Sequence, residues 1–414
     1  MPTQKFAPSR RSALAGLLSV AAAAGGARAQ PAPPPRPPGG PQAAPGATPP
    51  QPPSPPPPGA PQSLVTVNVP VTSSMSLVHV GSSDSFAITT EGRQAATLLY
   101  EALEATDPAV MRDKARQSSK IYDEIVPREN YGGEYTTLQW FDDYLAADET
   151  DRPGFLTDPQ VNFFFQQFSA EDYKLLKEYL DRKYRLHDVG DEESKAGQDR
   201  KVWLEDTILF ENPRREAWEH SSELLRLLNI RPGMKIADVG SGPGYFTFKF
   251  ARLVGPEGHV YAIDMVEQHL RWVEQAKVVM DLKNVDTVET DGRSVGLAGV
   301  LENVDAVFLC SLYHNMYAMA TAPERDAFVQ SIKETIGPNG VLWLADNGLV
   351  PPGVLPYHGP YVAKELLLAQ LLNYGFELLE EHQFVPQRYL LVLRNTPPTA
   401  PDQPSPEPAA VKHS

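Results

Sequence analysis

The sequence contains almost no cysteine. Cys310 is the single cysteine among 414 residues, so no disulfide can form within the chain. It stands at the end of an apolar stretch, which indicates a small buried side chain rather than a reactive thiol. The fold must therefore be stabilised by a hydrophobic core, and the chain is long enough to form one.

Basic residues are also scarce. The chain has 37 Lys and Arg against 52 Asp and Glu, which gives a formal net charge of -15. Binding to nucleic acid requires a basic surface that neutralises phosphates, so this balance argues against a nucleic-acid partner. It also disfavours adhesion to anionic lipid. The nine histidines show no spaced pair typical of a zinc site,.

Long apolar runs are missing except near the start of the chain. Residues 1–29 combine a basic start that includes Arg10–Arg11, an apolar run from Ala13 to Ala24, and small residues at Ala27–Ala29. The run is shorter than the ~20 residues that cross a bilayer. We expect a signal peptide, hence an exported or periplasmic protein with no transmembrane span after cleavage. The paired arginines resemble a twin-arginine signal, and an ordinary secretory signal remains open.

Proline is unevenly distributed and separates the predicted domains. Residues 30–63 are crowded with proline and contain a single charge, Arg36, so we expect a disordered, extended linker. Residues 64–200 include three stretches of helical periodicity and are predicted to form a smaller, mainly helical domain of unknown role. These stretches are Glu91–Ala105, Asp107–Ile125 and Glu171–Tyr184,. The tail, residues 396–414, is proline-rich and expected to be disordered.

The most informative segment is a glycine loop between a strand and a helix. Ile236–Val239 has strand character, and Tyr245–Leu253 is apolar and compatible with a helix. Gly240, Ser241, Gly242, Pro243 and Gly244 lie between them. Glycine lets the backbone turn sharply and approach a ligand, and the helix N-terminus offers N–H donors. The segment therefore predicts a cradle for a nucleotide-like ligand.

The spacing of the glycines separates two classes of ligand. A dinucleotide fingerprint reads G-x-G-x-x-G, whereas this loop reads G-x-G-x-G and Pro243 removes one N–H donor,. Asp238 precedes the first glycine, where a carboxylate would repel a phosphate but could hold an ammonium group. An NAD(P)-dependent oxidoreductase, which would bind a dinucleotide in this loop, remains an alternative interpretation.

This loop resembles motif I of class I S-adenosylmethionine-dependent methyltransferases, in particular the broad group similar to the quinone-biosynthesis C-methyltransferases. The resemblance implies S-adenosylmethionine as the cofactor. It implies that Asp264, with its neighbour Met265, lies at the ribose, because an acid after the second strand can accept bonds from both hydroxyls. It further implies that Asp291 and Gly292, after the third strand, lie at the adenine.

The remaining pattern predicts an α/β fold over residues 201–395. Near-continuous apolar strands alternate with helices, which indicates a doubly wound, mostly parallel sheet of seven strands. The expected strands are 236–239, 259–263, 286–290, 304–310, 340–345, 376–384 and 388–394. The expected helices are 213–228, 245–253, 267–280, 323–336 and 362–374. The last two strands are joined by a link too short for a crossover, so we expect an antiparallel hairpin.

The candidate catalytic residues follow the fourth strand. In such sheets the ligand lies outside the carboxyl ends of the strands, near the switch between the first and fourth. This predicts Tyr313 and His314 beside the reacting group, with His314 as general base; local packing is the competing interpretation. Tyr357 and His358 are further candidates. Asp346-Asn347 looks like the metal turn of catechol-type O-methyltransferases, but no acid follows the fourth strand, so no metal is expected.

Three functional hypotheses follow from these patterns. The favoured one is a methyltransferase acting on a small-molecule acceptor, with O-, N- and C-methylation all open. The second is the NAD(P)-dependent oxidoreductase. The third is a non-catalytic cofactor-binding or interaction protein that retained the fold, because an exported enzyme would be separated from a cofactor made in the cytoplasm. The sequence indicates neither the acceptor nor an oligomeric state.

Overall fold

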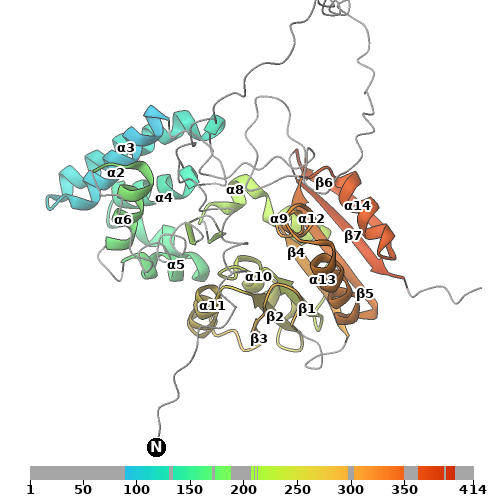
Figure 1. The fold of residues 1–414 in the computed structure, drawn as a ribbon. Coiled ribbons are helices and arrows are strands. Elements are labelled where there is room, and N and C mark those ends of the chain that lie inside the picture. The colour runs from blue at the N-terminus through green and yellow to red at the C-terminus, as the bar shows by residue number, and fades with distance from the viewer. Residues whose placement is uncertain are drawn as a thin grey trace, which may run out of the picture. The chain divides into compact units, whose positions relative to one another are not determined.

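Seven strands of the described residues form one sheet (Figure 1). The computed structural model describes residues 89–129, 134–169, 173–187, 207–208, 210–211, 213–296, 303–348, 362–386 and 388–396. The predicted leader, the proline-rich linker, the tail beyond residue 396, and the candidates Tyr357 and His358 lie outside these residues.

The order of the strands confirms the predicted fold class. The sheet runs β3-β2-β1-β4-β5-β7-β6. Its first five strands pair in parallel, whereas β7 is antiparallel to both β5 and β6. The strands are β1 Lys235–Val239, β2 His259–Asp264, β3 Val285–Glu289, β4 Val304–Cys310, β5 Ile336–Asn347, β6 Phe376–Val385 and β7 Arg388–Asn395. The chain crosses from one side of β1 to the other between β3 and β4, which creates the switch point.

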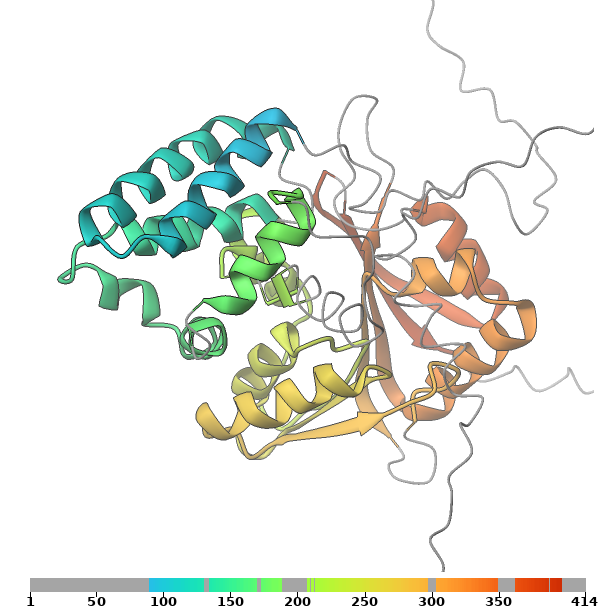
Figure 2. The same cartoon turned by 60° about the vertical axis from the view of Figure 1, so that its left-hand side comes forward.

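Helices cover both faces of the sheet, as Figure 2 shows. The helices that follow the strands are α10 Tyr245–Val254, α11 Glu267–Val279, α12 Tyr313–Ala318, α13 Ala322–Thr335 and α14 Lys364–Asn373. On one face Phe248 and Trp272, from α10 and α11, pack into a core with Phe308 of β4. On the other face Phe328 of α13 and Leu367 of α14 pack with alternate residues of the same strands. Burial on both faces explains why these strands are apolar throughout.

The strand β5 begins earlier than the sequence predicts. It starts at Ile336, which pairs with Val304, before a register shift on β4. A Cβ atom at Gly340 would lie 2.7 Å from the carbonyl oxygen of Val304, so only glycine allows the strands to approach there. The helical periodicity over residues 323–336 hides the early start of this strand from sequence analysis.

The N-terminal part of the described chain is helical, as expected. Its elements are α2 Thr90–Glu104, α3 Pro108–Glu129, α4 Glu134–Ala146, the short 3-10 helix Arg152–Leu156, α5 Pro159–Ser169 and α6 Lys174–Tyr184. The sequence did not indicate α4, because polar as well as apolar residues are buried around it, including Thr137 and Asp142. The hydrophobic core continues from these helices to the α10 and α11 face of the sheet.

The predicted helix over residues 213–228 is wrong. The structure has two short helices there, α8 Arg215–Glu219 and α9 Ser221–Leu227, separated by His220 in a left-handed conformation with φ 54°. The Glu216 carboxylate accepts bonds from Ser221 Oγ (3.0 Å) and Ser222 N (2.9 Å), so it caps the new helix start. Apolar periodicity alone did not reveal this break.

None of the helices within the described ranges is both long and apolar enough to cross a bilayer.

Candidate active site

Several polar side chains gather at the carboxyl edge of the sheet, where β1, β2, β4 and β5 end. The glycine loop leaves β1 at this edge, and the turn after β4 lies beside it. A Cβ atom at Gly240 would lie 2.9 Å from the Leu312 side chain, so the turn preceding Tyr313 and His314 packs directly against the loop. The structure therefore brings two predicted parts of the site together.

The backbone conformation at three positions of the loop favours glycine. Gly240, Gly242 and Gly244 have φ angles of 74°, 54° and 105°, a region that other residues rarely adopt. The loop is held by N–H bonds from Gly240 (2.8 Å) and Ser241 (3.0 Å) to the carbonyl of Ile263 on β2. The loop is thus a rigid turn at the start of α10, with Phe210 lying near Gly242.

Asp264 ends β2 and faces this loop. Its carboxylate accepts bonds from the backbone N–H of Gly242 and of Val266, each 2.8 Å long, and His269 Nδ1 lies 3.5 Å away. Burial by itself would raise the pKa of Asp264, but His269 and the two N–H groups outweigh it and lower the pKa,. Each carboxylate oxygen keeps a further lone pair, so the group can also accept bonds from a pair of hydroxyls.

Asp238, one residue before the end of β1, lies beneath the loop. It is buried and accepts a 2.6 Å bond from Thr247 Oγ1 on α10. Burial raises its pKa to about 7, while Thr247 and Arg215 act in the opposite direction. A carboxyl group so poised gains a negative charge readily when a cation approaches.

The remaining predicted cofactor residues are more exposed. Met265 is half-buried after Asp264, and Asp291 is exposed after β3. The Asp291 carboxylate accepts a 2.9 Å bond from the N–H of Arg293, and Gly292 has a φ of 76°. Asp291, Gly292 and Arg293 form a tight turn at the same edge of the sheet.

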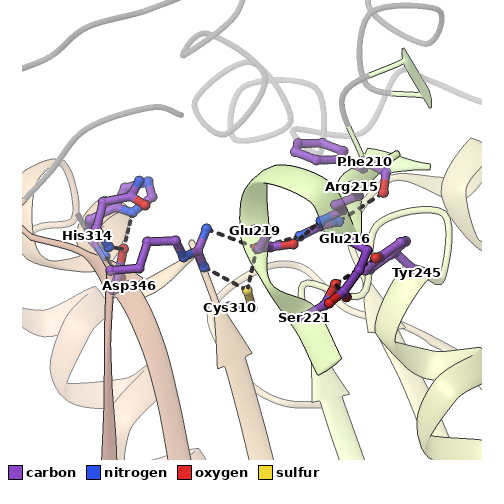
Figure 3. Close-up of polar contacts among 11 residues, drawn as sticks. Phe210, Arg215, Glu216, Glu219, Ser221, Tyr245, Cys310, His314 and Asp346 are labelled. Carbon is purple, nitrogen blue, oxygen red and sulfur yellow. Dashed lines mark hydrogen bonds and ion pairs between the residues drawn. The ribbon is translucent and has the colours of Figure 1, made fainter. Parts of the chain in front are cut away.

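Tyr313 and His314 have different surroundings. The Tyr313 side chain is fully buried in the core on the α13 and α14 face, and its hydroxyl donates a 2.8 Å bond to Gln370. His314 lies at the strand ends, with Nδ1 2.7 Å from Asp346 Oδ1. Figure 3 shows His314 and Asp346 at the ends of their strands. The structure brings His314 to the edge of the sheet, whereas Tyr313 packs behind it.

A buried ion-pair network lies beside this pair and was not predicted. Glu219 of α8 accepts bonds from Arg215 (Nη2, 3.1 Å) and from Arg388 of β7 (Nη1, 3.0 Å). Arg388 Nη2 also lies 3.1 Å from Cys310 Sγ, and burial raises the pKa of that thiol to about 11. Figure 3 shows Arg215, Glu219 and Cys310 in this arrangement. The network joins α8 to β4 and β7.

Local sequence patterns carry little signal for this network, because a charged side chain is ordinarily expected at the surface. The Arg215 guanidinium is nevertheless buried and lies 4.2 Å from the ring centroid of Tyr245. Arg388 begins the last strand and is also buried. The neighbouring Arg214 donates to Gln139 (3.2 Å) and pairs with Asp143.

Among the residues that the structure describes, no group of three or more His, Cys, Asp or Glu side chains is arranged to hold a metal ion. Asp346, which the sequence suggested as part of a possible metal turn, has its carboxylate bonded to His314 and to the N–H of Asn347.

Comparison with known proteins agrees with this geometry. Residues 230–371 match the family model described as a methyltransferase domain. This segment holds the glycine loop, Asp264, His314 and Asp346, so the predicted site residues lie within the part of the chain that is similar to methyltransferase domains. The predicted class of enzyme and cofactor is thereby confirmed at the level of the domain.

Curated relatives match over the same part of the chain. A protein-L-isoaspartate O-methyltransferase of Methanothrix thermoacetophila is 33% identical over 118 residues, which is 28% of this chain and 48% of that protein. A demethylmenaquinone methyltransferase of Bacillus mycoides is 32% identical over 104 residues, 25% of this chain and 40% of that protein. The chain thus spans less than half the length of these relatives.

Solved structures are also similar. A methyltransferase from Aquifex aeolicus, described as dependent on S-adenosylmethionine, matches 47% of this chain and 98% of its own, with 20% identity and a TM-score of 0.39.

The residues present fit S-adenosylmethionine on their own geometry. The loop glycines, all with positive φ, form a tight turn that leads directly into the N-terminus of α10, where backbone N–H groups are available to a ligand. The Asp264 carboxylate has acceptor capacity for ribose hydroxyls, and Asp238 lies where a positive charge would favour its ionised form.

Proposed function

We propose that this protein transfers a methyl group from S-adenosylmethionine to a small-molecule acceptor. The observation that carries the proposal is the rigid loop Gly240–Gly244, bonded through Gly242 to Asp264 and packed through Gly240 against Leu312. This packing supports a cofactor cradle near the turn that carries His314. The net charge of -15 favours a small-molecule acceptor over nucleic acid.

Each residue has a defined task in this proposal. S-adenosylmethionine supplies a methyl group on a positively charged sulfur, which is already a good leaving group. The glycine loop and Asp264 orient the ligand, and orientation supplies much of the rate enhancement in such transfers. Asp238 stabilises the positive charge of the ligand's amino-acid end. His314 accepts a proton from the acceptor.

Binding distinguishes this proposal from a dinucleotide-dependent oxidoreductase. We expect S-adenosylhomocysteine to raise the melting temperature of the purified protein and NAD(P) to leave it unchanged. Asp264→Ala should abolish the stabilisation, while Asp281→Ala, at an exposed site between α11 and the start of β3, should keep it. Stabilisation by NAD(P) alone would overturn the proposal.

Turnover distinguishes it from a non-catalytic binding protein. Incubation with cofactor carrying a deuterated methyl group, followed by mass spectrometry of acceptor compounds, should reveal labelled products. Tight binding of S-adenosylhomocysteine with no labelled product from any acceptor would favour the non-catalytic alternative.

We also propose that the protein is exported. The basic start, the apolar run Ala13–Ala24 and the small residues Ala27–Ala29 support this,. Mass spectrometry of the protein from its native host should find a mature N-terminus after residue 29. An intact N-terminus at Met1 would contradict export. Replacing Arg10 and Arg11 with lysine should block export only if the twin-arginine route is used.

A further inference from the structure

The pair His314 and Asp346 is buried at the carboxyl edge of the sheet. Nδ1 and Oδ1 are 2.7 Å apart, and the two side chains are 3% and 0% exposed. Two adjacent strands bring the residues together: His314 lies in α12 just after β4, and Asp346 lies near the end of β5. Register makes them neighbours, because Cys310 pairs with Ala345.

Asp346 is held in a single orientation. Its Oδ2 accepts a 3.0 Å bond from the N–H of His314, and its Oδ1 accepts a 2.8 Å bond from the N–H of Asn347. The same Oδ1 faces His314 Nδ1. Because a carboxylate can only accept, Nδ1 of the neutral imidazole must carry the proton, which leaves a lone pair on Nε2.

The second ring nitrogen is available for chemistry. Within the described residues, every interaction of His314 is made with Asp346 and none involves Nε2. The turn that carries His314 packs through Leu312 against Gly240, so this nitrogen belongs to the edge that holds the cofactor cradle. Ser311, at the start of the turn, has a φ of 52°, a strained conformation of the kind found at functional sites.

We propose that Asp346 is the positioning residue of a His314–Asp346 dyad and that the acceptor reacts through a hydroxyl group. This inference rests on the proposed methyl transfer. A hydroxyl oxygen is a weak nucleophile until its proton is removed, whereas a neutral amine attacks with its own lone pair. A fixed imidazole base therefore benefits a hydroxyl acceptor more than an amine.

The proposed reaction is a direct transfer of the methyl group from sulfur to oxygen. The hydroxyl oxygen forms a bond to the methyl carbon while the bond from that carbon to sulfur breaks, and the electron pair of the broken bond stays on sulfur. The hydroxyl proton passes to His314 Nε2. Asp346 stabilises the resulting imidazolium through Nδ1–H, and the proton later leaves to solvent.

A second His–Asp pair provides a matched control. His259 Nε2 lies 3.0 Å from Asp286 Oδ2 at the starts of β2 and β3, which is the opposite edge of the sheet, and this pair is more exposed. If both His–Asp contacts are purely structural, replacing either aspartate should have a similar effect on turnover. If His314 and Asp346 form a catalytic dyad, only the replacement of Asp346 should lower turnover.

The first experiment measures the tautomer and needs no acceptor. ¹⁵N NMR of the full-length protein should find His314 protonated on Nδ1 and bare on Nε2, and Asp346→Asn should populate the other tautomer. Asp286→Asn should leave the His314 signals unchanged. A wild-type His314 that is protonated on Nε2 and bare on Nδ1 would overturn the dyad.

The second experiment measures the reaction. Deuterated-methyl cofactor is offered with phenols, aliphatic alcohols, primary amines and 1,3-diketones, and products are located by mass spectrometry. We expect methylation at oxygen, a kcat lowered by roughly 10²–10⁴-fold in Asp346→Asn with KM nearly unchanged, and normal rates in Asp286→Asn. S-adenosylhomocysteine affinity should be the same in all three proteins.

The outcomes separate the inference from the function on which it rests. Methylation at nitrogen or carbon in preference to oxygen, or an unchanged kcat in Asp346→Asn, overturns the hydroxyl dyad and leaves the methyltransferase intact. Loss of S-adenosylhomocysteine binding by the wild-type protein overturns the proposed function itself.

Discussion

Asp238 and Asp264 are buried at the ends of neighbouring strands, yet their carboxyl groups have opposite proton affinities. Asp264 receives two backbone N–H bonds and contacts His269, and its pKa is lowered. At Asp238 burial raises the pKa to about 7, because the bonds from Thr247 and the charge of Arg215 do not outweigh it. At Asp264 the charge and hydrogen bond of His269, together with the two backbone donors, do outweigh burial,.

Replacing Asp238 should therefore change how stability depends on pH. The folded state binds the Asp238 proton up to about pH 7, whereas the ordinary value is 3.8. Wild-type stability consequently falls as pH rises from about 4 to about 7, and this cost persists above it. Relative to wild type, Asp238→Asn should gain roughly 2–4 kcal/mol in unfolding free energy between pH 4 and pH 8. Urea denaturation measures this, and parallel curves for both proteins would refute it.

Gly244 and Gly233 allow a comparison of conformation with crowding. Both have positive φ, 105° and 85°, but a Cβ at Gly244 would lie 2.8 Å from Phe248 and 3.0 Å from Val273, while Gly233 has open space. We expect Gly233→Ala to cost about 1–2 kcal/mol for the conformation alone. Gly244→Ala should cost a further 1–3 kcal/mol for overpacking, and only this variant should lose S-adenosylhomocysteine affinity in calorimetry. Equal losses of stability would show that crowding is relieved.

At the scale of elements, buried charges join pieces that sequence patterns treat separately. Glu219 lies between Arg215 of its own helix and Arg388 of the last strand, and both Glu219 and Arg388 are almost wholly buried. Such a network adds little net stability over apolar packing, but it penalises wrong arrangements of its elements. It therefore specifies where α8 lies relative to the strand ends.

Glu219→Gln should be strongly destabilising. It removes the carboxylate between two buried guanidinium groups, and breaking a buried pair in this way costs about 3–5 kcal/mol. Glu223→Gln is the matched control, since Glu223 pairs with Arg226 at the surface and its loss should change stability little. Thermal and urea unfolding of both variants test this, and a small effect of Glu219→Gln would show that the guanidinium groups find other partners.

At the scale of the molecule, the helical segment and the sheet share one hydrophobic core. Phe163 of α5 meets Trp272 of α11 edge to face, with ring centroids 5.0 Å apart. Gln160 of the same helix donates a 2.9 Å bond to Glu211, whose pKa burial raises to about 7. Residue 211 lies next to Phe210, which packs near the glycine loop. The helices thus support the segment beside the glycine loop.

We expect the helical segment and the sheet to unfold together. Phe163→Ala should lower the unfolding free energy by about 3 kcal/mol, because it leaves a cavity in the shared core. Hydrogen exchange should then accelerate both in α2–α6 and in α10–α11. Val110→Ala, at a residue 47% exposed, should accelerate neither. Faster exchange in the helices alone would mean that the two parts are energetically separate.

The sequence predicted most of the sheet because its signals are local. Apolar runs, the glycine loop and the short link before β7 each lie within a few residues. The loop sequence alone predicted the turn between β1 and α10, and the end of β2 at Asp264 could be predicted because a strand end is a local feature. The missed α4 and the broken 213–228 helix show the limit, since burial of polar residues and capping by Glu216 depend on neighbours.

Local sequence patterns therefore determined the fold class and the position of the glycine loop between the first strand and its helix. Only the tertiary structure decided which side chains meet at the carboxyl edge. His314 and Asp346 become partners because β4 and β5 are adjacent and in register, and Tyr313 packs on the far face because successive helical residues point in different directions. Arg388 reaches Glu219 from about 170 residues away. Such contacts depend on register and packing between distant segments, which no local pattern encodes.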